Sequence, residues 1–253
     1  MIGIFDSGSG GLTVLRAIRD VLPSADVVYF GDIKNVPYGT KSPDELAELT
    51  VRALQLLHDR GARVIVSACN SVSASLAISL FEALSISPNS LIEMVGPTVR
   101  FFKDSPARLL LCATPATVRS AIYHNGFHMV GKEVTEIAIP ELASAIEFGA
   151  SETELERIVA DAFRGVPLKE YDALILGCTH YPLALSAFRN VIGDSLTIVD
   201  PARIVAERVE KEWWPREAGD GTLRFIISRE SKQFREYVAH LFPKDACTIE
   251  VLE

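Results

Sequence analysis

The stretch at residues 174–182 reads LILGCTHYP and joins a short apolar run to a glycine, a cysteine, a histidine and a proline. A run of this length that ends at small and polar residues is typical of a buried β-strand entering a turn. The stretch at residues 64–72, VIVSACNSV, has the same form. Its Cys69 lies 109 residues before Cys178. Two similar strand-to-helix corners are therefore expected, each with one cysteine.

Two further corners repeat at almost the same distance. Residues 4–11 read IFDSGSGG and residues 110–120 read LLCATPATVRS, and both run from apolar into polar residues. Thr114 follows Asp6 by 108 residues, which is nearly the distance between the two cysteines. The near-constant offset predicts two related halves, each with two functional corners.

Short apolar runs alternate with longer amphipathic stretches along the whole chain, which is typical of an α/β protein with largely parallel sheets. We expect strands over residues 2–5, 27–30, 64–67, 91–95, 109–112, 133–137, 174–176, 197–199, 223–227 and 247–251. We expect helices over residues 12–21, 43–60, 71–84, 115–124, 141–149, 152–163, 183–191, 202–211 and 232–241.

The domain boundary is placed near Gly96 and Pro97. The predicted first domain comprises residues 1–96 together with the C-terminal segment 209–253, and residues 97–208 form the second domain. Ligands of open α/β sheets bind at the carboxyl ends of the strands. Two α/β domains related by pseudo-twofold symmetry would therefore enclose a small-molecule site in the cleft between them.

Composition narrows the possible functions. The 253 residues carry a net charge of −8 without a basic stripe, which argues against a nucleic-acid partner. No apolar run approaches the roughly 18 residues of a membrane span, and the N-terminus lacks the pattern of a signal peptide, so we expect a cytoplasmic protein without membrane contact. The cysteines are widely spaced and form no CxxC pair, which favours free thiols over disulfides or a structural zinc site.

The first-half corners contain groups that suit an anion and a reactive thiol. The glycines after Asp6 and Ser7 let the backbone approach a small carboxylate, although either residue could simply cap a turn. Cys69 precedes a predicted helix, whose N-terminal N–H groups favour a thiolate. The alternative is a small buried cysteine.

The second-half corner leaves more alternatives open. Cys178 and His180 could begin a metal site or form a nucleophile–base pair, but the other histidines show no ligand spacing. Asp32 and Glu147 are candidate site carboxylates, with a capping role or a solvated helix end as the alternatives. Cys112 and Cys247 are expected to be core cysteines, because neither stands at a comparable corner.

Two cysteines at equivalent corners suggest one specific chemistry. A single nucleophile needs a base but no second cysteine at the matching position. Thiols on opposite sides of one pocket can remove a proton from one face of a carbon and return a proton to the other face. The pair therefore favours inversion of a stereocentre without a cofactor.

The motifs DSGSGG, PYG, ACN, TPAT and GCTHYP occur in this order between residues 4 and 182. Together they resemble the motifs of the glutamate racemase family, within the cofactor-independent aspartate/glutamate racemases. Two departures are visible. Ser71 stands where the family usually has threonine after ACN, and Glu147 lies in the weakly matching AIEFG.

The resemblance implies interconversion of L- and D-glutamate without a cofactor or a metal, with D-glutamate used in peptidoglycan synthesis, by a protein that forms homodimers. It implies that Cys69 and Cys178 are the acid/base residues, assisted by Asp6, His180 and Glu147. It places at the substrate Ser7, Pro37, Tyr38, Gly39, Asn70, Ser71, Thr114, Thr117 and Thr179, to which we add Asp32.

Two other functions remain open at this stage. An aspartate racemase, or another amino-acid or hydantoin racemase, would share the same corners, because few pocket residues set the side-chain length of the substrate. A two-lobed protein that binds carboxylates without turnover is the second alternative, although binding alone does not require two thiols. Related decarboxylases keep only one of the two cysteines.

Overall fold

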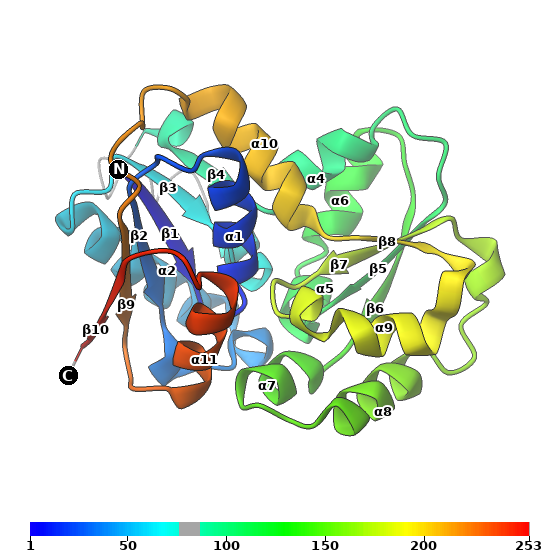
Figure 1. Ribbon diagram of the computed structural model, residues 1–253. Helices are drawn as coiled ribbons and strands as arrows, with labels where there is room; N and C mark the ends of the chain where they lie inside the picture. Colours follow the sequence, from blue (N-terminus) through cyan, green and yellow to red (C-terminus); the bar gives the residue numbers. More distant parts are fainter. Residues whose placement is uncertain (76–86, 253) are drawn as a thin grey trace.

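The computed structural model describes residues 1–75 and 87–252, which fold into two α/β lobes that lie side by side (Figure 1). The first lobe is built on a six-stranded sheet with the order β10-β9-β2-β1-β3-β4, and the second lobe on a four-stranded sheet with the order β6-β5-β7-β8. Every pairing of named strands is parallel. The strands are β1 (Ile2–Asp6), β2 (Val27–Gly31), β3 (Val64–Ser67), β4 (Leu91–Glu93), β5 (Leu109–Ala113), β6 (Val134–Ala138), β7 (Ala173–Gly177), β8 (Thr197–Val199), β9 (Leu223–Ile227) and β10 (Cys247–Val251).

The α-helices cover both faces of each sheet. They are α1 (Leu12–Val21), α2 (Pro43–Asp59), α4 (Val95–Phe102), α5 (Pro115–Arg119), α6 (Ile122–Met129), α7 (Leu142–Glu147), α8 (Glu152–Ala162), α9 (Leu185–Ile192), α10 (Pro201–Trp213) and α11 (Lys232–Leu241). Short 3-10 helices span Ile33–Asn35, Tyr38–Thr40, Asn70–Ser75, Pro88–Ser90, Leu168–Glu170, Tyr181–Ala184 and Gly193–Ser195.

The internal repeat predicted from the spacing is visible in the strand order. The sequence β2-β1-β3-β4 in the first sheet corresponds to β6-β5-β7-β8 in the second, because in each case the first strand of the half lies between the second and the third. Cys69 follows β3 and Cys178 follows β7, which occupy equivalent places. Strands β9 and β10 extend the first sheet beyond β2.

Alternating residues of the parallel strands supply the core on both sides of each sheet, as expected when helices cover both faces. In β1, Ile2 and Ile4 pack with α1, α10 and α11, whereas Phe5 packs on the side of α2. In the second lobe, one core joins the sheet to α7, α8 and α9, and the other joins it to α4 and α6. The chain passes between the lobes near α4 and α10 (Figure 1). The predicted boundaries at residues 96/97 and 208/209 fall inside these two helices and stay predictions.

All predicted strands are present, but three predicted elements differ from the structure. The strand expected over residues 91–95 ends at Glu93, because its carboxylate accepts hydrogen bonds from the backbone N–H groups of Val95 (2.6 Å) and Gly96 (2.5 Å) at the start of the unpredicted helix α4. The helix expected over residues 115–124 is two helices, α5 and α6, because Ala121 adopts a left-handed conformation with φ of 52°. Of the helix expected over residues 71–84, residues 76–84 lie outside the described residues, and Asn70–Ser75 is a 3-10 helix.

Two further observations apply to residues 1–75 and 87–252. No helix there combines the length and the apolar composition that a bilayer span requires. In the same ranges, no three or more histidine, cysteine, aspartate and glutamate side chains are grouped so as to hold a metal ion.

Because β9 lies in the core, its large side chains are expected to stabilise the folded state. Phe225 is 1% exposed and its ring lies 5.9 Å from the rings of Tyr29, Phe234 and Phe242. The Phe225→Ala variant should lower the free energy of unfolding by about 3–5 kcal/mol, because it leaves a cavity among these rings. The matched control is Phe148→Ala, since Phe148 is 67% exposed and its loss should change stability by less than about 0.5 kcal/mol. Urea unfolding curves measure both values, and equal losses would contradict the assignment of β9 to the core.

Candidate active site

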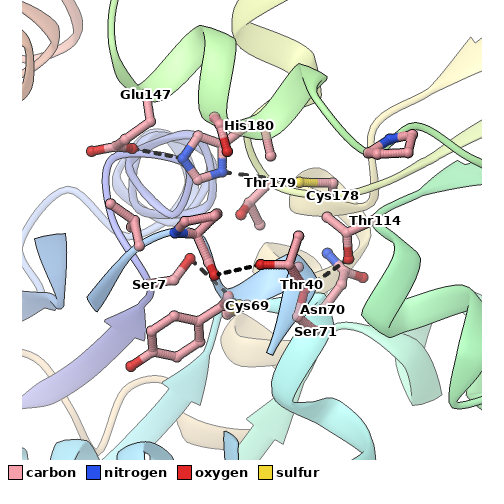
Figure 2. Close-up of a pocket in the computed structure, with 17 residues that line it drawn as sticks. Ser7, Thr40, Cys69, Asn70, Ser71, Thr114, Glu147, Cys178, Thr179 and His180 are labelled. Atoms are coloured by element: carbon pink, nitrogen blue, oxygen red, sulfur yellow. Dashed lines mark hydrogen bonds and ion pairs between the residues drawn. The ribbon is translucent and has the colours of Figure 1, made fainter. Parts of the chain in front are cut away.

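The carboxyl ends of the central strands meet at one cavity between the lobes (Figure 2). Both cysteines line it, with Cys69 coming from the first lobe and Cys178 from the second. Each is about 5% exposed or less. The other lining residues are Ser7, Val36, Pro37, Tyr38, Gly39, Thr40, Asn70, Ser71, Thr114, Pro140, Ala143, Ser144, Glu147, Thr179 and His180.

Cys178 lies beside a buried ion pair. Its Sγ is 3.9 Å from Nδ1 of His180, and Nε2 of the same ring is 2.7 Å from Oε2 of Glu147 (Figure 2). Burial alone would lower the pKa of His180, but its hydrogen bonds to Cys178 and Glu147 and their negative charge raise that pKa well above its ordinary value. These contacts therefore favour the imidazolium form of the ring, which places a positive charge beside the sulfur of Cys178.

Cys69 has a different environment. Its thiol donates to Oγ of Ser7 at 3.7 Å, and its neighbours include the carboxylate of Asp6. Burial, followed by the negative charge of Asp6, raises the pKa of Cys69 to about 12. Cys69 is consequently a protonated thiol at neutral pH. The two sulfurs thus have unlike surroundings although they occupy equivalent places in the two halves.

Asp6 connects the lobes from behind the cavity wall. It is fully buried, and its Oδ1 accepts from the backbone N–H of Gly8 at 2.8 Å. Its Oδ2 accepts from the hydroxyl of Thr179 in the second lobe at 3.0 Å. Burial raises the pKa of Asp6, while the charge of His180 partly opposes this rise. Asp6 therefore supports Thr179 and influences Cys69 without being one of the lining residues.

The glycine-rich corner holds a carboxylate that belongs to the protein. The backbone N–H and the hydroxyl of Ser9 donate to Glu147 at 2.8 Å and 3.0 Å. A Cβ at Gly8 would lie 2.6 Å from Oε2 of Glu147, and a Cβ at Gly10 would lie 2.5 Å from Nδ1 of His180. The glycines thus allow the second lobe to approach the backbone of the first. The carboxylate bound at this corner is therefore that of Glu147, in place of the small carboxylate ligand expected from the sequence. Ser7 still faces the cavity.

A group of neutral donors faces the cavity opposite the histidine. The hydroxyls of Ser71 and Thr114 lie 2.9 Å apart across the two lobes. The amide nitrogen of Asn70 is buried and has no hydrogen-bond partner within residues 1–75 and 87–252. Hydroxyl and amide groups are suitable donors to a carboxylate. This side of the cavity can therefore orient a carboxylate ligand between the two sulfurs.

Two residues expected at the substrate lie behind the lining instead. Asp32 accepts hydrogen bonds from the hydroxyls of Tyr38 (2.7 Å) and Ser228 (2.6 Å) and from Asn35, so its carboxylate is already occupied. Thr117 lies in the first turn of α5, where its hydroxyl is 3.1 Å from that of Thr114. Neither residue lines the cavity. Both hold the lining residues in place.

Several residues of the site were not predicted from the sequence. Val36, Thr40, Pro140, Ala143 and Ser144 line the cavity. Val36 and Thr40 flank the PYG turn, which is the one sequence signal that indicates them. Ser9 lies within the glycine-rich corner at residues 4–11. Pro140, Ala143 and Ser144 lie in or next to α7 and do not follow the end of a predicted strand directly, so the sequence did not indicate that they belong to the site.

Comparison with known proteins identifies the family of the chain. Residues 12–209 match the Asp/Glu/Hydantoin racemase family. The chain is 34% identical to glutamate racemase 3 of Caldanaerobacter subterraneus subsp. tengcongensis, over 93% of this chain and 88% of the relative. It is 32% identical to the glutamate racemase of Aquifex aeolicus, over 94% and 92% of the two chains.

Solved structures give the same result. A glutamate racemase isoform of Bacillus anthracis superposes with a TM-score of 0.88 and 28% identity, covering 100% of this chain and 97% of the other. The glutamate racemase of Francisella tularensis in complex with D-glutamate gives 0.87 and 27%, with the same coverage. An aspartate racemase of Picrophilus torridus, at 0.60 and 18%, shares the fold. The chain therefore belongs to the Asp/Glu/Hydantoin racemase family, and racemases are isomerases.

Proposed function

We propose that this protein is a glutamate racemase that interconverts L- and D-glutamate by proton transfer between two cysteines, without a cofactor. The observation that carries the proposal is the placement of Cys69 and Cys178 at equivalent strand ends of opposite lobes, both lining one buried cavity. Relatives named glutamate racemase, which align over nine-tenths of the chain, support glutamate as the substrate.

The chemistry follows from the unlike environments of the sulfurs. The Cys178 thiolate takes the α-proton from one face of the substrate, so that the Cα–H bond breaks, an S–H bond forms and the electron pair spreads into the α-carboxylate. The Cys69 thiol then gives its proton to the opposite face, which forms a new Cα–H bond and leaves a thiolate. The reverse reaction exchanges the two roles. General acid–base catalysis of this kind needs both groups within hydrogen-bond reach of the same carbon.

The remaining site residues stabilise the charges that change. His180 balances the negative charge on Cys178, and Glu147 keeps His180 charged and oriented. Asn70, Ser71 and Thr114 supply donors that hold the substrate carboxylates in the ground state and in the transition state alike.

We further propose that the D-glutamate formed enters peptidoglycan synthesis and that the protein acts in the cytoplasm as a homodimer. These three points rest on the family resemblance. Light scattering of the purified protein tests the dimer directly.

The direct test of the activity is circular dichroism of L-glutamate incubated with the purified, cofactor-free protein. The optical signal should fall to zero as the racemic mixture forms. The same assay with L-aspartate distinguishes the aspartate alternative, and a higher kcat/KM for aspartate would contradict the proposal. Glutamate binding without any loss of signal would instead favour the non-catalytic carboxylate-binding protein.

Removal of either site cysteine should abolish racemisation. We expect Cys69→Ala and Cys178→Ala each to lower kcat by at least about 10³-fold, since each removes one of two obligatory proton carriers. Cys112→Ala is the matched control, because Cys112 is a fully buried cysteine in β5 whose thiol donates to the carbonyl of Ile175. Its kcat should stay within about twofold of the wild type. A wild-type rate in either site variant would disprove the two-thiol mechanism.

The charge on His180 should control the reactivity of Cys178. Removing the imidazolium disfavours the thiolate, so His180→Asn should slow alkylation of Cys178 by iodoacetamide at pH 7.5 by about tenfold. Alkylation of Cys69, which has no direct hydrogen bond to His180, should change little. The effect should disappear above the raised pKa of His180, where the wild-type ring is also neutral. Mass spectrometry of the labelled peptides gives each rate, and an unchanged rate at Cys178 would contradict the assignment.

A further inference from the structure

Tyr123 of the second lobe contacts Asn70 of the first. The phenol hydroxyl donates to Oδ1 of Asn70 at 2.7 Å, and both side chains are buried. The same Asn70 has a buried amide nitrogen without a protein partner within the described ranges, and Asn70 lines the cavity. A planar amide whose oxygen is held on one side presents its N–H groups in the opposite direction. The hydrogen bond from Tyr123 thus determines which atom of Asn70 is available to a ligand.

The local fold holds Tyr123 in a defined orientation. Ala121 separates α5 from α6 with a left-handed φ of 52°, a conformation that costs an L-residue roughly 1–2 kcal/mol. Strain of this kind persists only where the surrounding structure requires it. The Tyr123 ring is fully buried and stacks on Phe127 with 6.3 Å between ring centroids. The turn at Ala121 therefore directs a rigid aromatic side chain toward the first lobe.

Tyr123 keeps its proton over the physiological range. Burial, followed by the negative charge of Glu93, raises the pKa of the phenol. A protonated phenol can donate to Oδ1 of Asn70 and thereby leaves the NH₂ group of the amide for another acceptor. If the amide were rotated by 180°, its oxygen would face the cavity and repel a carboxylate.

We propose that Tyr123 is a positioning residue for substrate binding, which orients the Asn70 amide so that its NH₂ group donates to a substrate carboxylate. The proposal rests on the proposed function, because it takes glutamate as the ligand of this cavity. The Tyr123 hydroxyl comes from the second lobe and Asn70 from the first. The Asn70 amide therefore takes this orientation only when the two lobes are in contact. Tyr123 does not line the cavity and acts through Asn70.

Kinetics of the Tyr123→Phe variant test the proposal. The variant keeps the ring and removes one hydroxyl, so we expect the KM for glutamate to rise about tenfold while kcat stays within about twofold. This split is the signature of a lost interaction that is equal in the ground and transition states. An unchanged KM, or a fall confined to kcat, would overturn the proposal.

A double-mutant cycle separates positioning from a general structural effect. In the Asn70→Ala background, Tyr123→Phe should raise KM by less than about twofold further, because the group that it orients is absent. If Tyr123→Phe raises KM by the same factor in both backgrounds, the hydroxyl acts independently of Asn70 and the proposal is wrong.

A measurement without substrate distinguishes this proposal from the proposed function. In ¹⁵N-labelled, ligand-free protein, the side-chain amide pair of Asn70 is identified by its absence in Asn70→Ala. Tyr123→Phe should shift or broaden this pair and leave that of Asn125 unchanged, since Asn125 is exposed on the same helix. A shifted pair in a protein that does not racemise glutamate would contradict the proposed function alone. An unshifted pair would contradict the orienting role of Tyr123.

The wild-type protein provides a test that does not depend on how the variant folds. The Tyr123 hydroxyl proton should exchange slowly with solvent and show a nuclear Overhauser contact to the Asn70 side-chain amide. A rapidly exchanging hydroxyl without that contact would overturn the proposal.

Discussion

The ion pair between His180 and Glu147 is the interaction on which the rest of the site depends. Its two atoms lie 2.7 Å apart and both side chains are buried. A buried ion pair is tolerated only where further hydrogen bonds satisfy its remaining capacity. Ser9 of the first lobe supplies two of these bonds to Glu147, and the sulfur of Cys178 lies at the other nitrogen of the ring. The hydrogen bonds from Ser9 thus join the two lobes at Glu147, while the ion pair within the second lobe favours a charged histidine beside one thiol.

A repeated fold is combined here with an unequal distribution of charge. The repeated strand order brings β3 and β7 to equivalent places, so each cysteine reaches the cavity from its own lobe. The residues that follow them differ: Asn70 is a neutral donor, whereas His180 carries a charge. The symmetry of the backbone brings the two cysteines to one cavity from opposite lobes. The asymmetry of the side chains suits the proposed mechanism, which requires one sulfur to be a thiolate while the other is a thiol.

Much of this arrangement could be predicted from the sequence, because strands that are buried on both faces leave continuous apolar runs and their carboxyl ends mark the site. Helix α4 was missed because Gly96 and Pro97 read as a break, although proline is tolerated in the first turn of a helix. Asp32 was expected at the substrate, but its carboxylate is occupied by Tyr38 and Ser228, and Ser228 is distant in sequence. Tyr123 contacts Asn70 from a helix of the second lobe, so no local pattern could indicate it. The roles of Asp32 and Tyr123 therefore depend on contacts between segments that are distant in the sequence.

The most direct test of the two-thiol account is racemisation in deuterium oxide, followed separately from each enantiomer at early times. In deuterium oxide the thiol of the donating cysteine carries deuterium from solvent. It donates that deuterium to the face of the α-carbon opposite the one from which the other cysteine took the proton. The two-thiol mechanism predicts that D-glutamate formed from L-glutamate carries deuterium at the α-carbon while the remaining L-glutamate does not, with the mirror result from D-glutamate. Equal early labelling of both enantiomers, or a product that retains its original proton, would contradict it.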